Sequence, residues 1–255
     1  MELFLQEYGS GPPLIILHGL LGSLDNWHSL SRRFSSSFHV FALDQRNHGR
    51  SPHSEEFTYE AMAADLREFL HHRAISSAFV LGHSMGGKTA MRLALDSPEL
   101  IGKLIVVDIG PKAYAARHDV ILDALRSVDL NHVSSRNDAA EALASSIPSE
   151  ATRQFLLKNL KRNDDGTFSW KMNLEVIHRN YAHVNEAISA VHPFTKPSLF
   201  VRSTTAGYVT DEDLPGIAEL FPACKVIDVP VGHWIHAEAP DFFFTTVMDF
   251  LTTGS

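Results

Sequence analysis

Short runs of hydrophobic residues alternate with longer amphipathic stretches along most of this 255-residue chain. The short runs are rich in β-branched or aromatic residues and are bounded by turn signals, which is typical of strands in a parallel sheet covered on both faces. They lie at 14–17, 40–43, 78–81, 104–107, 198–201 and 226–229. Stretches such as 59–71 and 242–251 carry apolar residues at helical spacing. This alternation predicts a doubly wound, mostly parallel α/β sheet.

The alternation is interrupted between Pro111 and Pro193. Helices are predicted there at 115–128, 138–147, 150–160 and 174–189, with a turn at 163–166 and an extended stretch at 167–171. Ligands of open α/β folds bind at the carboxyl edge of the sheet. We therefore predict that residues 111–193 form a helical cap over that edge, inserted after the sixth strand, with residues 1–110 and 194–255 as the core. Helices packed laterally on the core are the alternative.

Charge and composition narrow the class of partner. The net charge of −8 argues against nucleic acid, since phosphate binding needs clustered Lys and Arg. The single cysteine, Cys224, excludes an intramolecular disulfide and is expected to be at least half buried. Fifteen histidines raise the question of a metal, but His71 and His72 are adjacent, and no HExxH pattern surrounds His233 and His236. We expect no metal site.

The first residues carry acidic side chains and lack both a basic segment and a long apolar segment, so no signal peptide is expected. No apolar run approaches the ~18 residues of a membrane-spanning helix. A cytoplasmic protein is the expectation. There is neither a GxGxxG sequence after a strand nor a phosphate-binding loop, and no cofactor is expected.

The sequence Gly82-His83-Ser84-Met85-Gly86 fits the nucleophile-elbow pattern GxSxG. An apolar strand precedes it and a helical run follows, as this motif requires. The sharp strand-to-helix turn strains the serine backbone and demands residues without a Cβ two positions before and after it. We predict that Ser84 is a nucleophile.

A serine hydroxyl needs a base. His233 follows the last predicted strand directly and is the expected base, while His236, nearer the next helix, is the competitor. His18 and His83 are interpreted as structural residues near the site. The oxyanion hole is expected from the backbone N–H groups of Met85 and Leu20.

The motifs at His18-Gly19, 44–51, the elbow and Gly232-His233 occur in the order seen in the α/β-hydrolase superfamily, which the chain resembles along nearly its whole length. Many members of that family place the acid of the triad after the seventh strand, but the matching segment, 201–209, holds no acidic residue. Asp108, at the end of run 104–107, is therefore the expected acid. Asp211 is the alternative, and Asp213 lies further along the same loop.

A closer resemblance is to the YbfF-type bacterial esterases. It rests on the segments 17–26, 44–51, 82–88, 107–111, 117–118 and 232–238. The resemblance implies hydrolysis of short to medium acyl esters, with acyl thioesters as a further option, and it is weaker through the predicted cap.

An acyl pocket needs apolar and a few polar side chains. Candidates that fit as a set, although each alone is more typical of ordinary packing, are Tyr114, Arg117, His118, Phe155, Trp170, Tyr181 and Trp234. Asp44 and Arg46 are interpreted as loop-stabilising residues. Lys88 lies in the first helical turn after the elbow, where a substrate-carboxylate role stays open.

Together these features predict a serine carboxylesterase. Haloalkane dehalogenases and epoxide hydrolases use an Asp nucleophile, so Ser84 argues against both. Two other functions remain compatible with the sequence. One is a lyase or carbon–carbon hydrolase on the same triad, and the other is a hydrolase-fold receptor for a small ligand.

Overall fold

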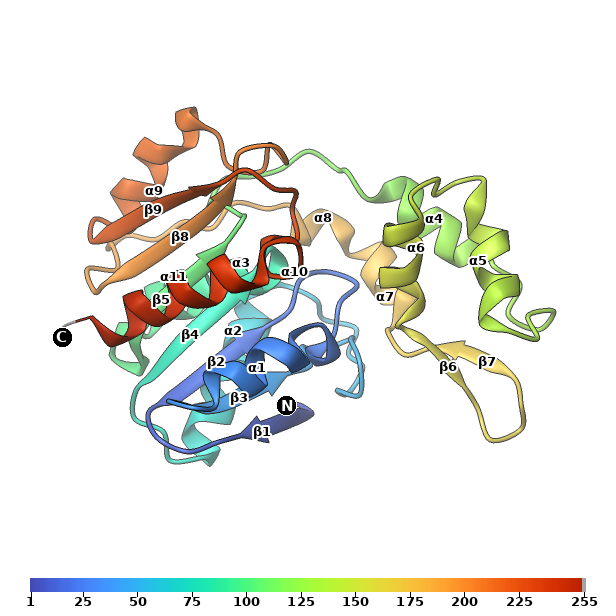
Figure 1. Ribbon diagram of the computed structural model, residues 1–255, viewed down its shortest axis with the longest axis horizontal. Coiled ribbons are helices and arrows are strands. Elements are labelled where there is room, and N and C mark those ends of the chain that lie inside the picture. The colour runs from blue at the N-terminus through green and yellow to red at the C-terminus, as the bar shows by residue number, and fades with distance from the viewer. Residues whose placement is uncertain (254–255) are drawn as a thin grey trace.

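The main sheet has seven strands within residues 1–253, the part of the chain that the computed structural model describes. They lie in the order β1–β3–β2–β4–β5–β8–β9 (Figure 1). Strand β1 runs antiparallel to β3, and the other pairs are parallel. The strands are β1 (Leu5–Tyr8), β2 (Pro13–Leu17), β3 (His39–Leu43), β4 (Ala78–His83), β5 (Ile101–Val107), β8 (Ser198–Ser203) and β9 (Cys224–Val229).

All six predicted strands are present, so the expected doubly wound sheet is confirmed. Strand β1 is an additional strand that the pattern did not predict. Two of its four residues, Gln6 and Glu7, are polar, and an edge strand needs no continuous hydrophobic run because part of it faces solvent.

Helices cover both faces of this sheet (Figure 1). On one face, α2 (Tyr59–His72) and α3 (Met85–Asp96) share a core with β2, β4 and β5. On the other face, α1 (His28–Phe34) and α11 (Pro240–Thr252) pack through Phe34, Phe243 and Val247. The predicted helices at 59–71 and 242–251 are thus confirmed, with ends that differ by one or two residues. The remaining elements of the core are η1 (Leu24–Trp27), η2 (Pro98–Leu100), η3 (Asp211–Asp213), α9 (Leu214–Leu220) and α10 (Ile235–Glu238).

The stretch between β5 and β8, residues 108–197, is called the inserted segment. Most of it lies beyond one edge of the core, on the right in Figure 1. A small antiparallel hairpin interrupts its helices. Its elements are α4 (Asp119–Ser127), α5 (Arg136–Ala144), α6 (Glu150–Leu157), β6 (Leu160–Arg162), β7 (Phe168–Trp170), α7 (Leu174–Arg179) and α8 (Tyr181–Val184).

The inserted segment differs from the sequence prediction in several places. It follows β5, the fifth strand in chain order and not the sixth. Helix α4 begins at Asp119 and not at 115, and α6 ends at Leu157 because Leu160 pairs with Trp170 in the hairpin. The helix predicted over 174–189 is two short helices separated at Asn180, whose side-chain amide donates to the Val176 carbonyl and closes α7.

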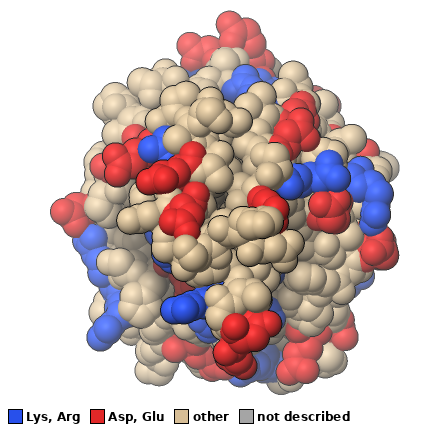
Figure 2. Space-filling model, turned by 90° about the vertical axis from the view of Figure 1, so that its right-hand side faces the viewer, with Lys and Arg blue, Asp and Glu red and all other residues tan. Residues whose placement is uncertain are grey.

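The outer face of the molecule, on the side of the inserted segment, carries charges of both signs (Figure 2). Acidic and basic side chains are spread over it without gathering into one basic patch. Among the described residues, no helix is both long and apolar enough to cross a membrane.

The parallel strands bring several chain segments to one edge of the sheet. His18 follows β2, Ser84 follows β4 and Asp108 follows β5, while His233 lies four residues beyond β9. Because carboxyl ends of parallel strands meet at the same edge, these segments meet there despite their separation in sequence.

Candidate active site

Ser84 occupies a strained turn between β4 and α3. Its backbone has φ 52° and ψ −118°, a left-handed conformation that costs energy for any residue with a side chain. Its N–H donates to the carbonyl of Val107 on the neighbouring strand (3.0 Å). A Cβ added at Gly82 would lie 2.1 Å from the Gly86 carbonyl oxygen, and one at Gly86 would lie 2.6 Å from the carbonyl oxygens of Leu17 and His18. The steric requirement predicted for both glycines is met.

Asp108 and His233 are hydrogen-bonded to each other. His233 Nδ1 lies 2.7 Å from Asp108 Oδ2, and Asp108 Oδ1 accepts from the backbone N–H of Ser203 (2.8 Å). The Asp108 side chain is fully buried, and burial raises the pKa of its carboxyl while the Ser203 N–H opposes this rise. Burial lowers the pKa of His233, so its imidazole is neutral at pH 7 with the Nδ1 proton directed at the carboxylate.

The two competing residues lie elsewhere. Asp211 Oδ1 accepts from Arg202 Nη2 (2.6 Å), and 82% of its side chain is exposed. His236 stacks on Trp27 with ring centroids 4.2 Å apart and makes no hydrogen bond to Asp108. Of the candidates considered from the sequence, Asp108 and His233 are therefore the pair that the fold brings together.

The turn after β2 is held by a network of buried neutral side chains. His18 Nδ1 donates to the Gly19 carbonyl (2.8 Å), and its Nε2 accepts from the N–H of Gln45 (3.0 Å). His48 Nε2 accepts from the N–H of Leu21 (3.2 Å). Leu21 has a positive φ of 57°. Burial lowers the pKa of His18 to about 4 and that of His48 to about 3, so both rings are neutral at pH 7.

The same turn leaves two backbone donors, the N–H groups of Gly19 and Leu20, without an acceptor among the described residues. The N–H of Leu21 is bonded to His48 and that of Gly22 to the Gly19 carbonyl (3.0 Å). No acceptor for the Leu20 N–H lies within residues 1–253. Leu20 and Met85 line the same small cavity beside Ser84.

His83 supports the loop that carries His233. Its Nε2 donates to the His233 carbonyl (3.0 Å), and the two rings lie 4.6 Å apart. Burial lowers its pKa well below the usual value. His18 and His83 therefore have the hydrogen-bonding positions expected of structural residues.

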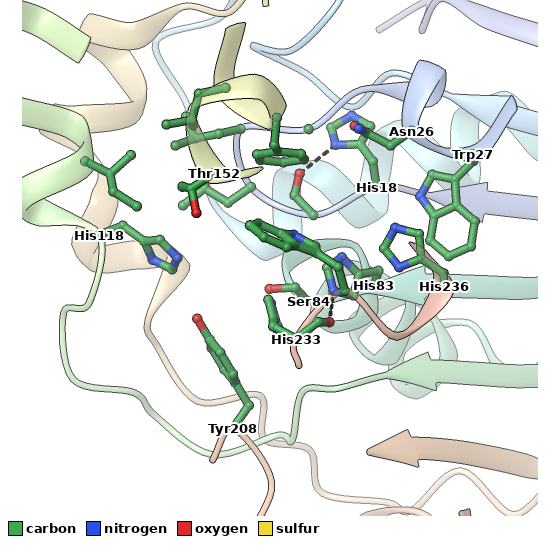
Figure 3. A pocket seen from close by; sticks show the side chains of 18 residues that line it. His18, Asn26, Trp27, His83, Ser84, His118, Thr152, Tyr208, His233 and His236 are labelled. Atoms are coloured by element: carbon green, nitrogen blue, oxygen red, sulfur yellow. Dashed lines mark hydrogen bonds between the residues drawn. The ribbon is translucent and has the colours of Figure 1, made fainter. Parts of the chain in front are cut away.

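Ser84 opens into a cavity of about 220 Å³ between the core and the inserted segment (Figure 3). Figure 3 shows Ser84, His83 and His233 together at one side of it, with His118 and Thr152 of the inserted segment facing them. The predicted pocket residues His118, Phe155 and Trp234 line this cavity. Phe155 and Trp234 pack together with ring centroids 5.1 Å apart.

A smaller cavity of about 30 Å³ lies on another side of Ser84. Its lining includes the predicted residues Tyr114, Arg117, His118 and Tyr181. The remaining candidate, Trp170, lines neither cavity. It lies on β7 opposite Leu160, so the sequence prediction that it borders the pocket is wrong.

The charged residues near the site have structural partners. Asp44 accepts from the backbone N–H groups of Leu24 and Arg50 (2.7 and 2.9 Å), and Arg46 pairs with Asp65 on α2 (2.6 Å). Both contacts fit the loop-stabilising role expected for Asp44 and Arg46. Lys88 is buried and donates to backbone carbonyls instead of pointing at the site, and burial lowers its pKa to about 7.

Sequence reasoning missed two residues that touch the Asp108–His233 pair. Ser203 binds Asp108 through its N–H, and the ring of Tyr208 stacks on His233 with centroids 3.9 Å apart. The available signal was their position: both lie at or just after the end of the strand that follows the inserted segment, where the expected acid was absent.

Comparison with known proteins agrees with this geometry. A family profile described as "alpha/beta hydrolase fold" matches residues 12–240. The chain is 38% identical over 253 residues to the sn-1-specific diacylglycerol lipase ABHD11 of Xenopus tropicalis, covering 96% of this chain and 79% of the relative. It is 33% identical over 248 residues to Esterase YbfF of Escherichia coli strain K12, covering 96% and 95%.

Among solved structures, that of a marine microorganism esterase matches with a TM-score of 0.96 and 41% sequence identity. The match covers 98% of this chain and 99% of that one. The resemblance to the YbfF-type esterases is thus confirmed, and the chain belongs to the α/β-hydrolase fold family, as the order of its motifs predicts.

Proposed function

We propose that this protein is a serine carboxylesterase that hydrolyses short to medium acyl esters through an acyl-enzyme on Ser84. The observation that carries the proposal is the 2.7 Å hydrogen bond between His233 Nδ1 and Asp108 Oδ2 beside a cavity that Ser84 also lines. The named esterase and lipase relatives, similar over nearly the whole chain, support ester hydrolysis as the reaction class.

The proposed reaction has two steps. Ser84 Oγ attacks the ester carbonyl carbon while His233 Nε2 accepts the serine proton, and the alcohol then leaves with that proton. Water attacks the acyl-enzyme in the second step, with His233 again as base, and the carboxylic acid is released. Asp108 holds the Nδ1 proton, which fixes the ring orientation and stabilises the imidazolium that forms in each step.

The backbone N–H groups of Leu20 and Met85 are the proposed oxyanion donors. Support comes from the turn after β2, where the amides of Leu21 and Gly22 already have acceptors, whereas those of Gly19 and Leu20 have none among the described residues. Of these two, Leu20 lines the small cavity together with Ser84 and Met85. A preorganised donor at this place stabilises charge that develops only in the transition state.

We further infer that residues 111–193 act as a cap that selects the acyl group. The larger cavity receives Ile121, Phe155 and Leu156 from this stretch and Trp234 from the core, so its walls suit an alkyl chain. The smaller cavity, with Tyr114, Arg117 and Tyr181, is more polar and suits the alcohol or thiol portion.

A chain-length series tests the proposal. Wild-type protein is assayed with 4-nitrophenyl esters from acetate to laurate and with acyl-CoA thioesters, and Ser84 is labelled with a fluorophosphonate and located by mass spectrometry. Ser84→Ala should lose all measurable turnover and labelling, whereas the matched surface change Ser37→Ala should keep both.

Other outcomes distinguish the alternatives. Full ester turnover in Ser84→Ala would refute the mechanism. No ester turnover in a wild-type protein that still reacts with the fluorophosphonate would favour a lyase or carbon–carbon hydrolase on the same residues. A large ligand-induced rise in melting temperature without steady-state turnover would favour a receptor.

A further inference from the structure

Two stretches of chain near the ends of the inserted segment are hydrogen-bonded to each other. The N–H of Tyr114 donates to the Asn185 carbonyl (2.8 Å), and the N–H of Ile188 donates to the Pro111 carbonyl (2.6 Å). We call these two segments, residues 111–114 and 184–188, the clasp. Because they lie near the two ends of the inserted segment, where its chain leaves and rejoins the core, their position influences how that segment sits over Ser84.

Lys88 reaches the clasp from the helix that begins directly after Ser84. Its Nζ donates to the Lys112 carbonyl on one segment of the clasp (2.9 Å) and to the Glu186 carbonyl on the other segment. The side chain is only 1% exposed. Its Nζ also lies 4.8 Å from the centre of the Tyr114 ring and 5.6 Å from that of Tyr59.

The chemistry of this site explains why a lysine is needed. Within residues 1–253, Lys88 forms no ion pair with a carboxylate, so two carbonyl oxygens and two aromatic faces are its polar surroundings. The lysine amino group has enough N–H donors for both carbonyls, two when neutral and three when protonated. If the clasp moved away, a buried polar group would lose its partners, which opposes that movement.

Lys88 is also coupled directly to the nucleophile. Its backbone N–H donates to the Ser84 carbonyl (3.1 Å), while its side chain holds the clasp. Tyr59, from the neighbouring helix, adds a hydrogen bond from its hydroxyl to the Val184 carbonyl (2.7 Å). Lys88 thus links the nucleophile turn, through its backbone, to both segments of the clasp, through its side chain.

We propose that Lys88 is a positioning residue that binds both segments of the clasp to α3, the helix that follows Ser84. In this way it sets the width of the cavity between Ser84 and the inserted segment. This inference rests on the proposed function for its effect on catalysis. Its structural part is independent of that function. It follows that the acyl cavity is held by a fixed connection and does not depend on substrate to assemble.

Lys88→Met is the direct test, with Lys103→Met as the matched control. Lys103 is likewise buried, and its Nζ donates to the carbonyls of Phe250, Leu251 and Thr253 at the end of α11, far along the chain from the clasp. Amide hydrogen exchange is measured for wild type and both variants. Lys88→Met should speed exchange at 111–114 and 184–188 by about tenfold or more, since local opening becomes easier. Lys103→Met should do so only around α11.

Kinetics supply the second readout. Lys88→Met should raise KM for a long acyl ester about tenfold, roughly the effect of losing one or two buried methylene contacts. The kcat/KM for an acetate ester should stay within about twofold of wild type, because its two-carbon acyl group contacts less of the cavity wall than a long chain does. A defect that is merely structural would lower kcat/KM equally for the two substrates.

Four outcomes decide the matter. Unchanged exchange at the clasp in Lys88→Met would overturn the proposal, as would equal losses for long and short esters. If Lys88→Met fails to fold, Tyr59→Phe is measured instead, because it removes only the hydroxyl bound to Val184. Amide exchange at 184–188 should then be faster than in wild type, by less than the tenfold expected for Lys88→Met. Unchanged exchange in Tyr59→Phe would overturn the proposal. Faster exchange in a protein that turns over no ester would uphold the clasp and reject the proposed esterase function.

Discussion

Asp108 and His233 lie 2.7 Å apart across 125 residues of sequence, although they come from strands that do not touch. Strand β8 lies between β5 and β9 in the sheet. Asp108 bridges this gap because its backbone leaves β5 with a positive φ of 49°, and β8 contributes the Ser203 N–H to its other oxygen. The proposed acid thus follows one strand while the next strand holds it in place, and this arrangement gives the first prediction.

Asp108→Asn should lower kcat for an ester about 10³-fold or more, because the amide cannot stabilise the imidazolium and favours the wrong ring tautomer. Steady-state kinetics with a 4-nitrophenyl ester measure the change. Circular dichroism should show that the fold is retained.

Asp211→Asn is the control for this change, since its exposed carboxylate binds only Arg202 among the described residues. It should keep kcat within about twofold of wild type, as surface ion pairs contribute little. Activity lost in Asp211→Asn but kept in Asp108→Asn would reverse the assignment of the acid.

The parts of the site that could be predicted from sequence are those set by local geometry. Ser84 lies in a strand–turn–helix motif that is contained within a few residues, and His233 lies four residues beyond a strand. The clash at Gly82 is local to this motif, whereas the clash at Gly86 is with the carbonyls of Leu17 and His18 at the end of β2. Ser203 and Tyr208 were not predictable in this way, because their contacts with Asp108 and His233 depend on which strands are neighbours. Trp170 shows the converse failure, as its aromatic character gave no information on the direction of the hairpin.

The same reasoning applies to the fold. Continuous hydrophobic runs located the buried strands. The extended stretch predicted at 167–171 contains β7, but its partner β6 and the edge strand β1 carry mixed polar residues and no such signal. The clasp and the role of Lys88 within it depend on backbone carbonyls, which no residue pattern marks.

Gly86→Ala should destabilise the protein and abolish activity. The added Cβ would lie 2.6 Å from two carbonyl oxygens at the end of β2, so the nucleophile turn or the turn after β2 must shift. We expect a loss of about 3 kcal/mol in the free energy of unfolding, the upper range for overpacking. Urea denaturation measures this loss.

Gly216→Ala is the matched control, because a Cβ there meets nothing within 4 Å and the residue lies in α9. It should leave activity unchanged and stabilise the protein by at most about 1 kcal/mol, as Ala favours helix more than Gly does. A Gly86→Ala variant as stable and active as Gly216→Ala would contradict the steric explanation of the elbow.

Stability should fall as the pH is lowered below 6.5. The pKa of His18 is about 4 and that of His48 about 3 in the folded protein, against 6.5 for an ordinary histidine. Between each folded-state pKa and 6.5, the unfolded chain binds more protons than the folded one. The stabilisation from keeping these histidines neutral is therefore complete above pH 6.5 and is lost as the pH falls toward 4. For His18 alone the loss is about 3 kcal/mol at most.

Urea denaturation at pH 8, 6.5, 5.5 and 4.5 measures this dependence. His48→Gln, which keeps an acceptor for the Leu21 N–H, should reduce the slope between pH 6.5 and 4.5. The surface change His72→Gln should leave the slope as in wild type. Identical slopes in all three proteins would show that the network of His18 and His48 does not carry the pH dependence.

The inserted segment should also influence catalysis through Asn159. This buried residue donates from Nδ2 to the carbonyl of Leu21 (2.7 Å), in the turn whose Leu20 amide is the proposed oxyanion donor. Asn159→Ala leaves that carbonyl unpaired and should cost about 1–3 kcal/mol of stability. Because Leu21 has a positive φ, the turn should relax and misplace the Leu20 N–H.

Such a displacement should lower kcat about 10- to 100-fold while KM changes little, since an oxyanion donor acts mainly in the transition state. Asn163→Ala is the matched control. It removes a hydrogen bond to Thr167 in the exposed turn of the same segment's hairpin and should leave kcat unchanged. A loss of stability in Asn159→Ala without any loss of kcat would show that the inserted segment packs on the turn after β2 but does not set its catalytic geometry.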